Sequence, residues 1–347
     1  MTERVSGTGV RLAPYTTLGL GGRAKVFDEA SSSEEIVEVV RAFDWAGKPV
    51  LVLGGGSNLV ISDDGFDGLV LRVASRGIEV EGDRVTAQAG EDWDALVERM
   101  VAEGRSGLEC LSGIPGLVGS TPIQNVGAYG QDVSQTITAV RVYDRNHGEV
   151  RDLTADECGF AYRHSVFKED LGRYVVLAVT YELSRDALSG PIAYRELAAR
   201  LGVELGDRVP LARVRTAVLE LRAGKGMVLD ANDPDTRSAG SFFTNPILTG
   251  GQAAELELRA PGFPRWDMPD GAVKVPAAWL IENAGFPKGY RRGPARISTK
   301  HTLALTNPEL AASTEELLDL AREVRDGVFE KFGVTLVNEP VMVGTRL

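Results

Sequence analysis

The sequence is poor in the residues that carry most metal and disulfide chemistry. Its 347 residues include two cysteines, Cys110 and Cys158, and three widely spaced histidines, His147, His164 and His301. Two cysteines cannot form a disulfide framework, and neither a CxxC pair nor an HExxH motif is present. We therefore expect a protein of a reducing compartment without a metal site.

Basic charge and long apolar runs are also scarce. Lysine and arginine total 38 against 49 acidic residues, which gives a formal net charge of -11. This balance argues against a general nucleic-acid binder but leaves room for a local cationic pocket. The first residues, MTERVSGTGVRL, show no basic-then-apolar signal, and no apolar run is long enough to span a bilayer. We expect a cytoplasmic protein that does not bind membranes and is a monomer or a weak oligomer.

The motifs of several common catalysts are missing as well. Ser241 does not lie in the GxSxG motif that presents a nucleophilic serine. The sequence GGGSNL fits neither the GxGxxG dinucleotide pattern nor the phosphate loop of nucleotide hydrolases. Together these absences favour chemistry that is supplied by a bound cofactor.

Local patterns predict a mixture of helices and strands. We expect helices over 31–47, before Gly104, over 211–224, around 277–285 and from Ser313, where Ser313 and Glu316 form a capping box. We expect strands over 48–53, 137–144, 174–183, 301–307 and 333–340. Strands that often follow one another favour an α+β fold over a regular βαβ series. The turn-rich segment 227–240 predicts a domain boundary.

Two glycine-rich segments are candidates for ligand contact. In VLGGGSNLV (52–60), three glycines after a buried strand allow backbone amides to approach a diphosphate; the alternative is an ordinary glycine turn. The segment SGIPGLVGSTPIQNVGAYG (112–130) is apolar and almost uncharged, although glycine and proline make it irregular. It is expected either to lie along an extended cofactor or to form a packed core crossover.

Three further segments carry isolated polar groups. Arg163 lies among aromatic and apolar residues in AYRHSVFK, where its guanidinium requires an anionic partner, either a ligand or a structural ion pair. Glu339 interrupts the apolar VNEPVMVG and is either an aimed carboxylate or a strand ending. Ser241 in RSAGSFFTNP could be a nucleophile, a proton donor, a ligand contact or the start of a strand.

These segments, in this order, resemble the UDP-N-acetylenolpyruvoylglucosamine reductases, which belong to the flavoproteins with a vanillyl-alcohol-oxidase type of FAD domain. The resemblance runs from TTLGLGGRA (16–24) through LGGGSN, IPGLVGSTPIQNVGAYG, YRHSVFK, AGSFFTNP and AAWLIENAG to NEP. It covers nearly the whole chain, and seven motifs in order are specific although each one alone is weak.

The resemblance implies a fold, a cofactor and a reaction. The fold would be α+β, with a two-part FAD-binding region and a separate substrate-binding domain. The expected parts are 1–66 with 333–347, then 67–227, and finally 228–332. NADPH would reduce a non-covalent FAD, which would then reduce the enolpyruvyl ether of a UDP-sugar to UDP-N-acetylmuramate, a step of peptidoglycan precursor synthesis.

The resemblance also implies roles for individual residues. Arg163, Ser241 and Glu339 would be the catalytic residues. Tyr129, Tyr194, Lys225 and Asn245 would contact the substrate, with Tyr194 on the inserted loop of the type I members, PIAYREL (191–197); the alternative for Tyr194 is a residue of an amphipathic helix. The positions expected to bind FAD are Gly54, Gly55, Gly56, Ser57, Asn58, Leu59, Ile114, Gly119, Ser120, Thr121 and Gly127.

The three catalytic roles make physical sense for this reaction. Hydride addition to the terminal carbon of the enolpyruvyl group pushes charge onto the next carbon and its carboxylate, and this charge must be stabilised and then protonated. Arg163 can pair with the carboxylate. Glu339, if burial keeps it protonated, can donate a hydrogen bond to the enol form, which leaves Ser241 as the proton donor.

The sequence departs from the family pattern at three places. Val341 stands where many type I members carry an arginine, Thr244 replaces a common lysine, and His301 stands where some members have glutamine. Two other functions remain open: a different FAD-dependent oxidoreductase that acts on a small alcohol or sugar, and a non-catalytic nucleotide-sugar or flavin binder. The binder is disfavoured because it would not need a buried proton donor.

Overall fold

The computed structural model describes residues 6–347, which fall into two compact units. The first unit contains the described residues up to Val10 together with Ala24–Gly55 and Asp67–Gly224. The second contains Arg11–Arg23, Gly56–Phe66 and Lys225–Leu347. The chain therefore passes from one unit to the other five times. The three-part division that the resemblance implies stays a prediction.

The described residues of the first unit form two larger sheets, one short two-stranded sheet and five α-helices. A four-stranded sheet has the order β1-β2-β5-β3, and a five-stranded sheet has the order β11-β10-β12-β7-β6. The strands are β1 (Gly7–Arg11), β2 (Arg23–Ala30), β3 (Val50–Leu53), β5 (Phe66–Val73), β6 (Ile78–Glu81), β7 (Arg84–Gln88), β10 (Ile137–Asp144), β11 (Glu149–Thr154) and β12 (Tyr174–Glu182), with the short pair β8 (Gly127–Ala128) and β9 (Gln131–Asp132). The helices are α1 (Ser33–Trp45), α2 (Trp93–Ala102), α3 (Val166–Glu169), α4 (Arg195–Leu201) and α5 (Leu211–Gly224).

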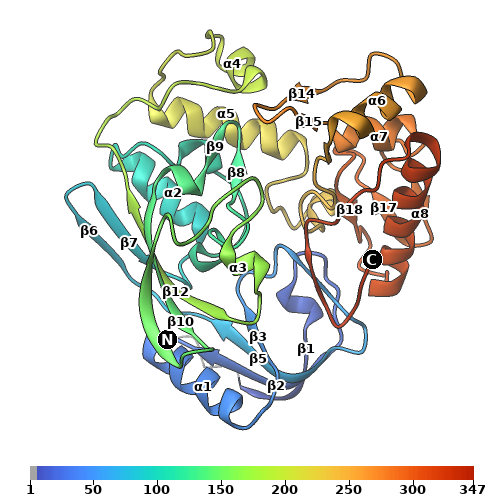
Figure 1. Ribbon diagram of the computed structural model, residues 1–347. Helices are drawn as coiled ribbons and strands as arrows, with labels where there is room; N and C mark the ends of the chain where they lie inside the picture. Colours follow the sequence, from blue (N-terminus) through green and yellow to red (C-terminus); the bar gives the residue numbers. More distant parts are fainter. Residues whose placement is uncertain (1–5) are drawn as a thin grey trace. The chain divides into compact units, whose positions relative to one another are not determined.

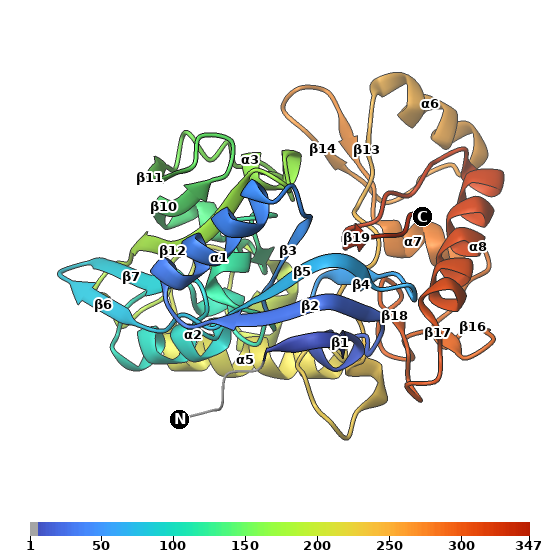
Figure 2. The same ribbon diagram turned by 90° about the horizontal axis from the view of Figure 1, so that it is seen from below.

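The two sheets are connected differently. In the first, β3 and β5 run parallel, whereas every neighbouring pair in the five-stranded sheet is antiparallel. Figure 2 shows β1, β2 and β5 side by side, with α1 on one face of their sheet. The antiparallel sheet supplies much of the core, because β10 buries Ile137, Val140, Val142 and Tyr143 and the buried residues run almost unbroken along β12.

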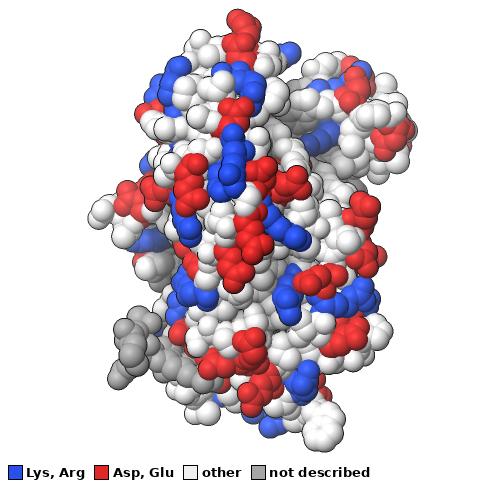
Figure 3. All heavy atoms as spheres, turned by 90° about the vertical axis from the view of Figure 1, so that its left-hand side faces the viewer, with Lys and Arg blue, Asp and Glu red and all other residues white. Residues whose placement is uncertain are grey.

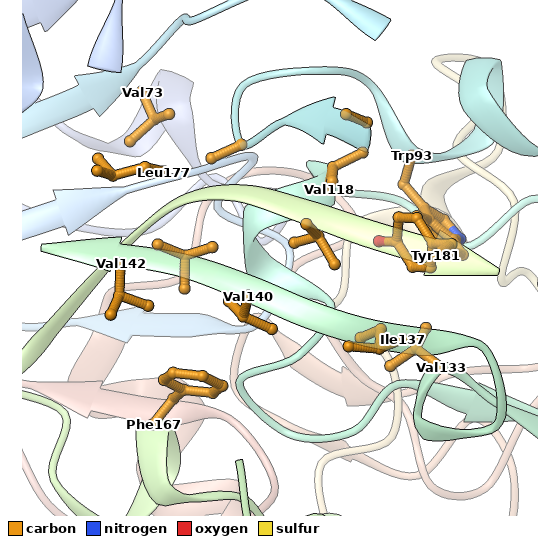
Figure 4. Close-up of a cluster of buried hydrophobic side chains, with 14 of the residues drawn as sticks. Val73, Trp93, Val118, Val133, Ile137, Val140, Val142, Phe167, Leu177 and Tyr181 are labelled. Carbon is orange, nitrogen blue, oxygen red and sulfur yellow. The ribbon is translucent and has the colours of Figure 1, made fainter. Parts of the chain in front are cut away.

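The core of the first unit joins this sheet to α2 and to the glycine-rich segment. Figure 4 shows Val140 and Val142 of β10 and Tyr181 of β12 in one cluster with Trp93 of α2 and Val118. The Trp93 and Tyr181 rings lie 6.0 Å apart. Trp93 also donates from its ring nitrogen to the carbonyl of Leu111 at 3.1 Å, so burial leaves its polar atom satisfied.

The second unit is smaller in its sheets and richer in irregular chain. Its strands are β4 (Leu59–Ile61), β13 (Ile247–Leu248), β14 (Trp266–Asp267), β15 (Val273–Lys274), β16 (Arg291–Arg292), β17 (Ala295–Ile297), β18 (Leu305–Thr306) and β19 (Val341–Val343). Its helices are α6 (Gly250–Arg259), α7 (Ala277–Asn283) and α8 (Thr314–Phe332). Figure 1 shows α8 beside β17 and β18. The strands β19 and β4 pair in parallel, although 279 residues of the chain lie between Ile61 and Val341.

Most of the predicted elements are present. The helix predicted over 31–47 is α1, whose N-cap Ser32 accepts from the amide of Glu35, and the predicted capping box at Ser313 forms at the start of α8. The helix predicted before Gly104 is α2, and those around 277–285 and over 211–224 are α7 and α5. The strands over 48–53, 137–144 and 174–183 correspond to β3, β10 and β12.

The prediction of a strand over 333–340 is wrong. Only one isolated bridge, between Phe243 and Asn338, occurs in that segment, and the strand β19 begins at Val341. Pro340 has no amide hydrogen for a ladder, so the chain leaves one partner before it and joins β4 after it. The strand predicted over 301–307 is reduced to the two residues of β18.

The surface carries acidic and basic residues in close alternation. Figure 3 shows blue and red side chains interspersed across the face that it presents. Many of these charges are paired, as in Arg99 with Glu103 at 2.8 Å and Arg76 with Glu91 at 3.4 Å. Within residues 6–347, no helix combines the length and the apolar character that crossing a membrane requires.

Candidate active site

The glycine loop after β3 has a backbone that a ligand could approach closely. A Cβ added to Gly54 would lie 2.6 Å from the Ser120 hydroxyl oxygen, and one added to Gly55 would lie 2.8 Å from the Gly116 Cα. Only glycine therefore lets the loop and the segment around 116–120 come this close. The loop continues into the second unit through Gly56, which has a φ of +63°.

The loop is tied into the second unit by its own backbone. The amide of Thr17 donates to the carbonyl of Gly56 at 3.2 Å, and the amide of Val341 donates to the carbonyl of Asn58 at 3.0 Å. Leu59 then starts β4. Hydrogen bonds at Gly56 and Asn58 thus fix the second half of the predicted diphosphate loop.

The segment 112–130 packs through its backbone and small residues. The amide of Gly119 donates to the carbonyl of Ala89 at 2.9 Å, and a Cβ at Gly119 would meet the Ala89 Cβ at 2.6 Å. Ile114 is partly buried against the core of the first unit. The segment is therefore packed against the core, as the second alternative predicts, and its contact with an extended cofactor stays a prediction.

Thr121 differs from its neighbours in where its side chain points. It is 3% exposed, and its hydroxyl bonds to the Val118 carbonyl at 2.8 Å and lies 3.2 Å from the Tyr181 hydroxyl. A structural role accounts for this side chain. Its predicted contact with FAD, like those of Ser120 and the glycines, stays a prediction.

Arg163 is held in a strained turn by two carbonyl oxygens. Its φ is +54°, and its guanidinium donates to the carbonyl of Asn125 at 3.3 Å and to that of Gly127 at 2.8 Å. Neutral carbonyl groups orient the guanidinium without cancelling its charge. The side chain is half-buried, and the planar guanidinium has the geometry that matches a carboxylate.

Backbone strain concentrates around this arginine. Four non-glycine residues in the described chain have a positive φ, and three of them are Asn125, Tyr129 and Arg163. The Asn125 side chain donates to the Ala161 carbonyl at 3.2 Å and accepts from the Ser134 amide at 3.1 Å. Such strain costs about 1–3 kcal/mol per residue and gathers at functional sites.

Two tyrosines predicted to contact the substrate lie together in the first unit. Tyr129 follows β8, and Tyr194 is the N-cap residue of α4. Their ring centroids are 5.5 Å apart and their planes meet at 89°, which is the edge-to-face arrangement that aromatic rings favour. Burial raises the pKa of Tyr129 to about 12, so its hydroxyl is a hydrogen-bond donor at neutral pH.

Arg222 is a cation beside these tyrosines that the sequence did not point out. It lies in the last turn of α5, and burial lowers its pKa to about 10, against the opposing influence of Tyr129 and Asp94. A lowered pKa marks a guanidinium whose charge is poorly solvated, so an anion beside it would be stabilised. Only its position three residues before Lys225 could have drawn notice.

Ser241 lies in an extended strap that is bonded along both edges. On one edge the amide of Phe242 donates to the Leu303 carbonyl at 2.7 Å. On the other, the amide of Thr244 donates to the Val337 carbonyl at 3.0 Å. Phe242 and Phe243 are both 1% exposed, so they fix the strap in the core of the second unit while Ser241 stays only partly buried.

The backbone of Glu339 is bonded to the residue that follows Ser241. The amide of Glu339 donates to the carbonyl of Phe242, the residue after Ser241, at 2.8 Å. Gly240, with a φ of +73° and open space where a Cβ would stand, allows the turn that precedes the serine. A hydroxyl and a carboxylate are thus carried on bonded backbones of the second unit, whereas Arg163 belongs to the first unit.

The remaining predicted substrate contacts have mixed surroundings. The Asn245 side-chain oxygen accepts from the amide of Ala277 at 2.9 Å and so caps α7, which is a structural role. Lys225 is half-buried directly after α5. The predicted contacts of Tyr129, Tyr194, Lys225 and Asn245 with substrate stay predictions.

The three departures from the family pattern have structural partners. Val341 pairs with Leu59 in the parallel ladder, and the Thr244 hydroxyl donates to the Val337 carbonyl at 3.4 Å. The His301 ring nitrogen Nδ1 accepts from the amide of Leu303 at 3.2 Å. Leu303 in turn holds Phe242, so His301 supports the strap that carries Ser241.

Two family models match consecutive parts of this chain. Residues 24–154 match an FAD binding domain. Residues 233–343 match the C-terminal domain of UDP-N-acetylenolpyruvoylglucosamine reductase. The first match contains the glycine loop and the segment 112–130, and the second contains Ser241 and Glu339.

Similar proteins match almost the entire chain. The UDP-N-acetylenolpyruvoylglucosamine reductase of Thermobifida fusca is 58% identical, with 97% of this chain and 98% of that protein covered. The reductase of the same name from Streptomyces coelicolor is 57% identical, with 97% and 90% covered. The crystal structure of the reductase MurB from Thermus caldophilus superposes with a TM-score of 0.69 at 26% identity, covering 98% of this chain and 99% of that one. A chain that shares this identity, this fold and both domain models belongs to the family of UDP-N-acetylenolpyruvoylglucosamine reductases.

Proposed function

We propose that this chain reduces the enolpyruvyl double bond of UDP-N-acetylenolpyruvoylglucosamine to give UDP-N-acetylmuramate, with Arg163, Glu339 and Ser241 acting on the substrate. Family membership supports the reaction, and the backbone bond that joins the Ser241 strap to Glu339 is the observation that carries the assignment of residues.

FAD fits the residues of the first unit. Gly54 and Gly55 approach the segment 116–120 so closely that a side chain at either position would clash, which suits backbone contact with a diphosphate. When bound and reduced by NADPH, FAD supplies the hydride that reaches the terminal carbon of the enolpyruvyl group. Cys110 and Cys158 are both buried and free, which suits the reducing cytoplasm where we place the reaction.

Arg163 binds the substrate carboxylate in this proposal. Its two carbonyl partners hold the planar fork in one orientation, so little conformational entropy is lost when a carboxylate binds. Its charge stabilises the negative charge that develops on the carboxylate and the adjacent carbon as hydride adds.

Ser241 completes the reduction by protonating that carbon. The serine oxygen loses its proton to the carbanion-like carbon and regains one from water, so the enzyme returns to its starting state. Glu339 acts beside it in its protonated form, donating a hydrogen bond to the enol-like oxygen of the same intermediate. Tyr129, Tyr194, Lys225 and Asn245 bind the sugar nucleotide, with the lysine facing its diphosphate.

The test separates the two half-reactions by stopped-flow absorbance of the flavin. Native protein is expected to bleach with NADPH and to regain its colour when the enolpyruvyl sugar nucleotide is added. In Ser241→Ala, bleaching should be unchanged while the return of colour slows by about 10²–10⁴-fold, as expected for loss of a general acid.

Ser313→Ala is the matched control. It also removes a serine hydroxyl from the second unit, but its expected effect is a loss of about 1 kcal/mol of stability through the cap of α8, with normal kinetics. Bleaching that the enolpyruvyl substrate cannot reverse in native protein would refute the function. Return of colour at the native rate in Ser241→Ala would refute the role of the serine.

A further inference from the structure

Glu109 is a completely buried carboxylate that the reaction does not use. It lies in a single 3₁₀ turn, Glu109–Leu111, and has no exposed surface. Its two oxygens accept from the amide of Gly107 at 2.7 Å, the side-chain amide of Gln131 at 3.0 Å and the amide of Gly190 at 3.2 Å. Three segments distant in sequence therefore meet at one side chain.

Two of those segments carry the tyrosine pair. Gln131 is the first residue of β9, two residues after Tyr129, and Gly190 lies four residues before Tyr194. Figure 1 shows β8 and β9 below α4, the helix that Tyr194 caps. The turn and the loop also touch near Gly130, where a Cβ would lie 3.0 Å from that of Ala193.

The other backbone bonds of the loop lead away from the turn. The amide of Ser189 donates to the Val209 carbonyl at 2.8 Å, and the amide of Ile192 donates to the Asp207 carbonyl at 2.9 Å. These bonds shape the loop against the chain before α5 but do not attach it to the β8–β9 turn. Glu109 instead accepts a hydrogen bond from Gly190 of the loop and another from Gln131 of the turn, and so connects the two.

The side chain of Gln131 strengthens this attachment because its amide group both donates and accepts a hydrogen bond. While its amide nitrogen donates to Glu109, its amide oxygen accepts from the backbone amide of Cys110 at 2.9 Å. The Cys110 side chain lies in a small core with Ile192 and residues of α4 and α5, against which Tyr129 packs. The carboxylate is thus enclosed by well-packed residues and cannot exchange its partners for water.

We propose that Glu109 is a positioning residue that docks the Tyr194 loop onto the Tyr129 turn and so sets the tyrosine pair for binding the sugar nucleotide. The proposal rests on the proposed function, because it assigns the pair to the substrate. A carboxylate suits this task because it offers only acceptors to three N–H donors.

The three N–H donors to Glu109 determine which substitutions test the proposal. In Glu109→Gln, one amide oxygen can still accept from Gln131 and Gly190 while the new NH₂ group faces the Gly107 amide, so the long-range contacts survive at the cost of a local one. In Glu109→Ala, all three donors are left buried without an acceptor. The conservative variant should therefore rescue most of what alanine loses.

The first measurement is hydrogen exchange without NADPH or substrate. We expect peptides that span 186–196 to exchange faster in Glu109→Ala, close to native rates in Glu109→Gln, and peptides from β10 to exchange at native rates in both. Hydrogen exchange tests the docking of the loop even if the protein fails to reduce the sugar nucleotide. Failure of the proposed function can therefore be distinguished from failure of this proposal. Native exchange of 186–196 in Glu109→Ala would overturn the proposal.

The second measurement is steady-state kinetics in a double-mutant cycle. Glu109→Ala should raise KM for the enolpyruvyl sugar nucleotide by about tenfold and change kcat by less than about twofold. This pattern is expected because loss of the hydrogen bonds to the carboxylate weakens substrate binding alone. In a Tyr194→Ala background the same substitution should raise KM by less than about threefold, because its effect passes through the tyrosine. A full tenfold rise in both backgrounds would show that Glu109 acts elsewhere.

Gln131→Leu keeps the proposal testable if Glu109→Ala does not fold. This variant removes one donor to the carboxylate but leaves Glu109 and its bond to Gly190 in place. We expect a KM rise of about threefold and faster exchange of peptides over 127–131. Unchanged KM together with unchanged exchange would count against the positioning role.

Discussion

The chain around Arg163 is a tight backbone turn that side chains tie to other segments, whereas the chain around Ser241 is bonded to its neighbours largely through peptide groups. The Asn125 side chain bonds to Ala161 and Ser134, and the Lys168 ammonium donates to the Arg163 carbonyl at 3.2 Å. The Ser241 strap instead uses peptide groups to bond to Leu303, Val337 and Glu339. Around Arg163 three non-glycine residues, Asn125, Tyr129 and Arg163, have a positive φ, whereas between Arg237 and Pro246 no residue other than Gly240 does.

This contrast matches the work proposed for each segment. A cation that must fit a carboxylate benefits from a strained, rigid turn, because the guanidinium cannot then relax towards other partners. A proton donor must reach one carbon. An extended strap that is fixed by hydrogen bonds between peptide groups sets the position of this donor without depending on particular side chains. Substitutions should therefore disturb the two segments in different ways.

The largest effect is expected from Arg163 itself. Arg163→Met should slow flavin reoxidation by the sugar nucleotide about 10²–10³-fold, since the developing charge loses its preorganised partner. Arg163→Lys should recover part of the rate but not all, because an ammonium cannot form the two-pronged contact. Stopped-flow absorbance measures both, with bleaching by NADPH as the internal control. Reoxidation of the methionine variant at the native rate would remove Arg163 from the chemistry.

Asn125→Ala should have the next largest effect and should act through Arg163. It removes the bonds to Ala161 and Ser134 and places alanine at a φ of +47°, so we expect reoxidation to slow about tenfold. Asn125→Gly keeps the backbone conformation but not the bonds, and it separates the two causes. Full activity in both variants would show that Arg163 does not depend on side-chain support.

Phe243→Leu makes the opposite test in the second segment. Phe243 is 1% exposed, and shortening it should lower the free energy of unfolding by about 1–2 kcal/mol. Since the strap is bonded through peptide groups, reoxidation should stay within about threefold of native. Urea unfolding and stopped-flow absorbance give the two numbers, and a tenfold loss of rate would break the contrast.

The smallest effect concerns the pH dependence of stability. The pKa of Tyr129 is raised by burial to about 12 in the folded chain, above the usual value near 10. Folding therefore favours the neutral phenol, and this stability is present below pH 10 and lost as pH rises from 10 towards 12. Tyr129→Phe should lose less stability than native protein between pH 9.5 and 11.5 in urea unfolding. An equal loss in both would show that the phenol does not contribute.

Sequence patterns predicted best what is determined locally. Serine caps, early glutamates and Gly47 place both ends of α1 and the start of α8 to within two residues, because capping and helix propensity act within a turn. The predicted strand over 333–340 fails because pairing there depends on Phe243 and Leu59, which are far away in the sequence. Register between distant segments leaves no local signal.

The candidate site divides in the same way. Arg163, Ser241 and Glu339 were identified through ordered motifs, and the composition of each segment alone left several alternatives open. The positive φ of Arg163 has no sequence signature, since arginine rarely adopts this conformation. Glu109 stands in an ordinary GLEC sequence, and its three donors come from separate segments, so only the folded chain reveals it.

The parallel pair of β4 and β19 has a consequence for the order in which the second unit folds. Residues 11–23 and 56–66 emerge early during synthesis, yet β4 cannot find its partner until residue 343 has left the ribosome. Until then the edge of β4 lacks the strand that finally covers it, and such an edge invites pairing with other chains. The long delay before this contact forms makes the second unit the slow and aggregation-prone part of folding, and the first place where a chaperone would help.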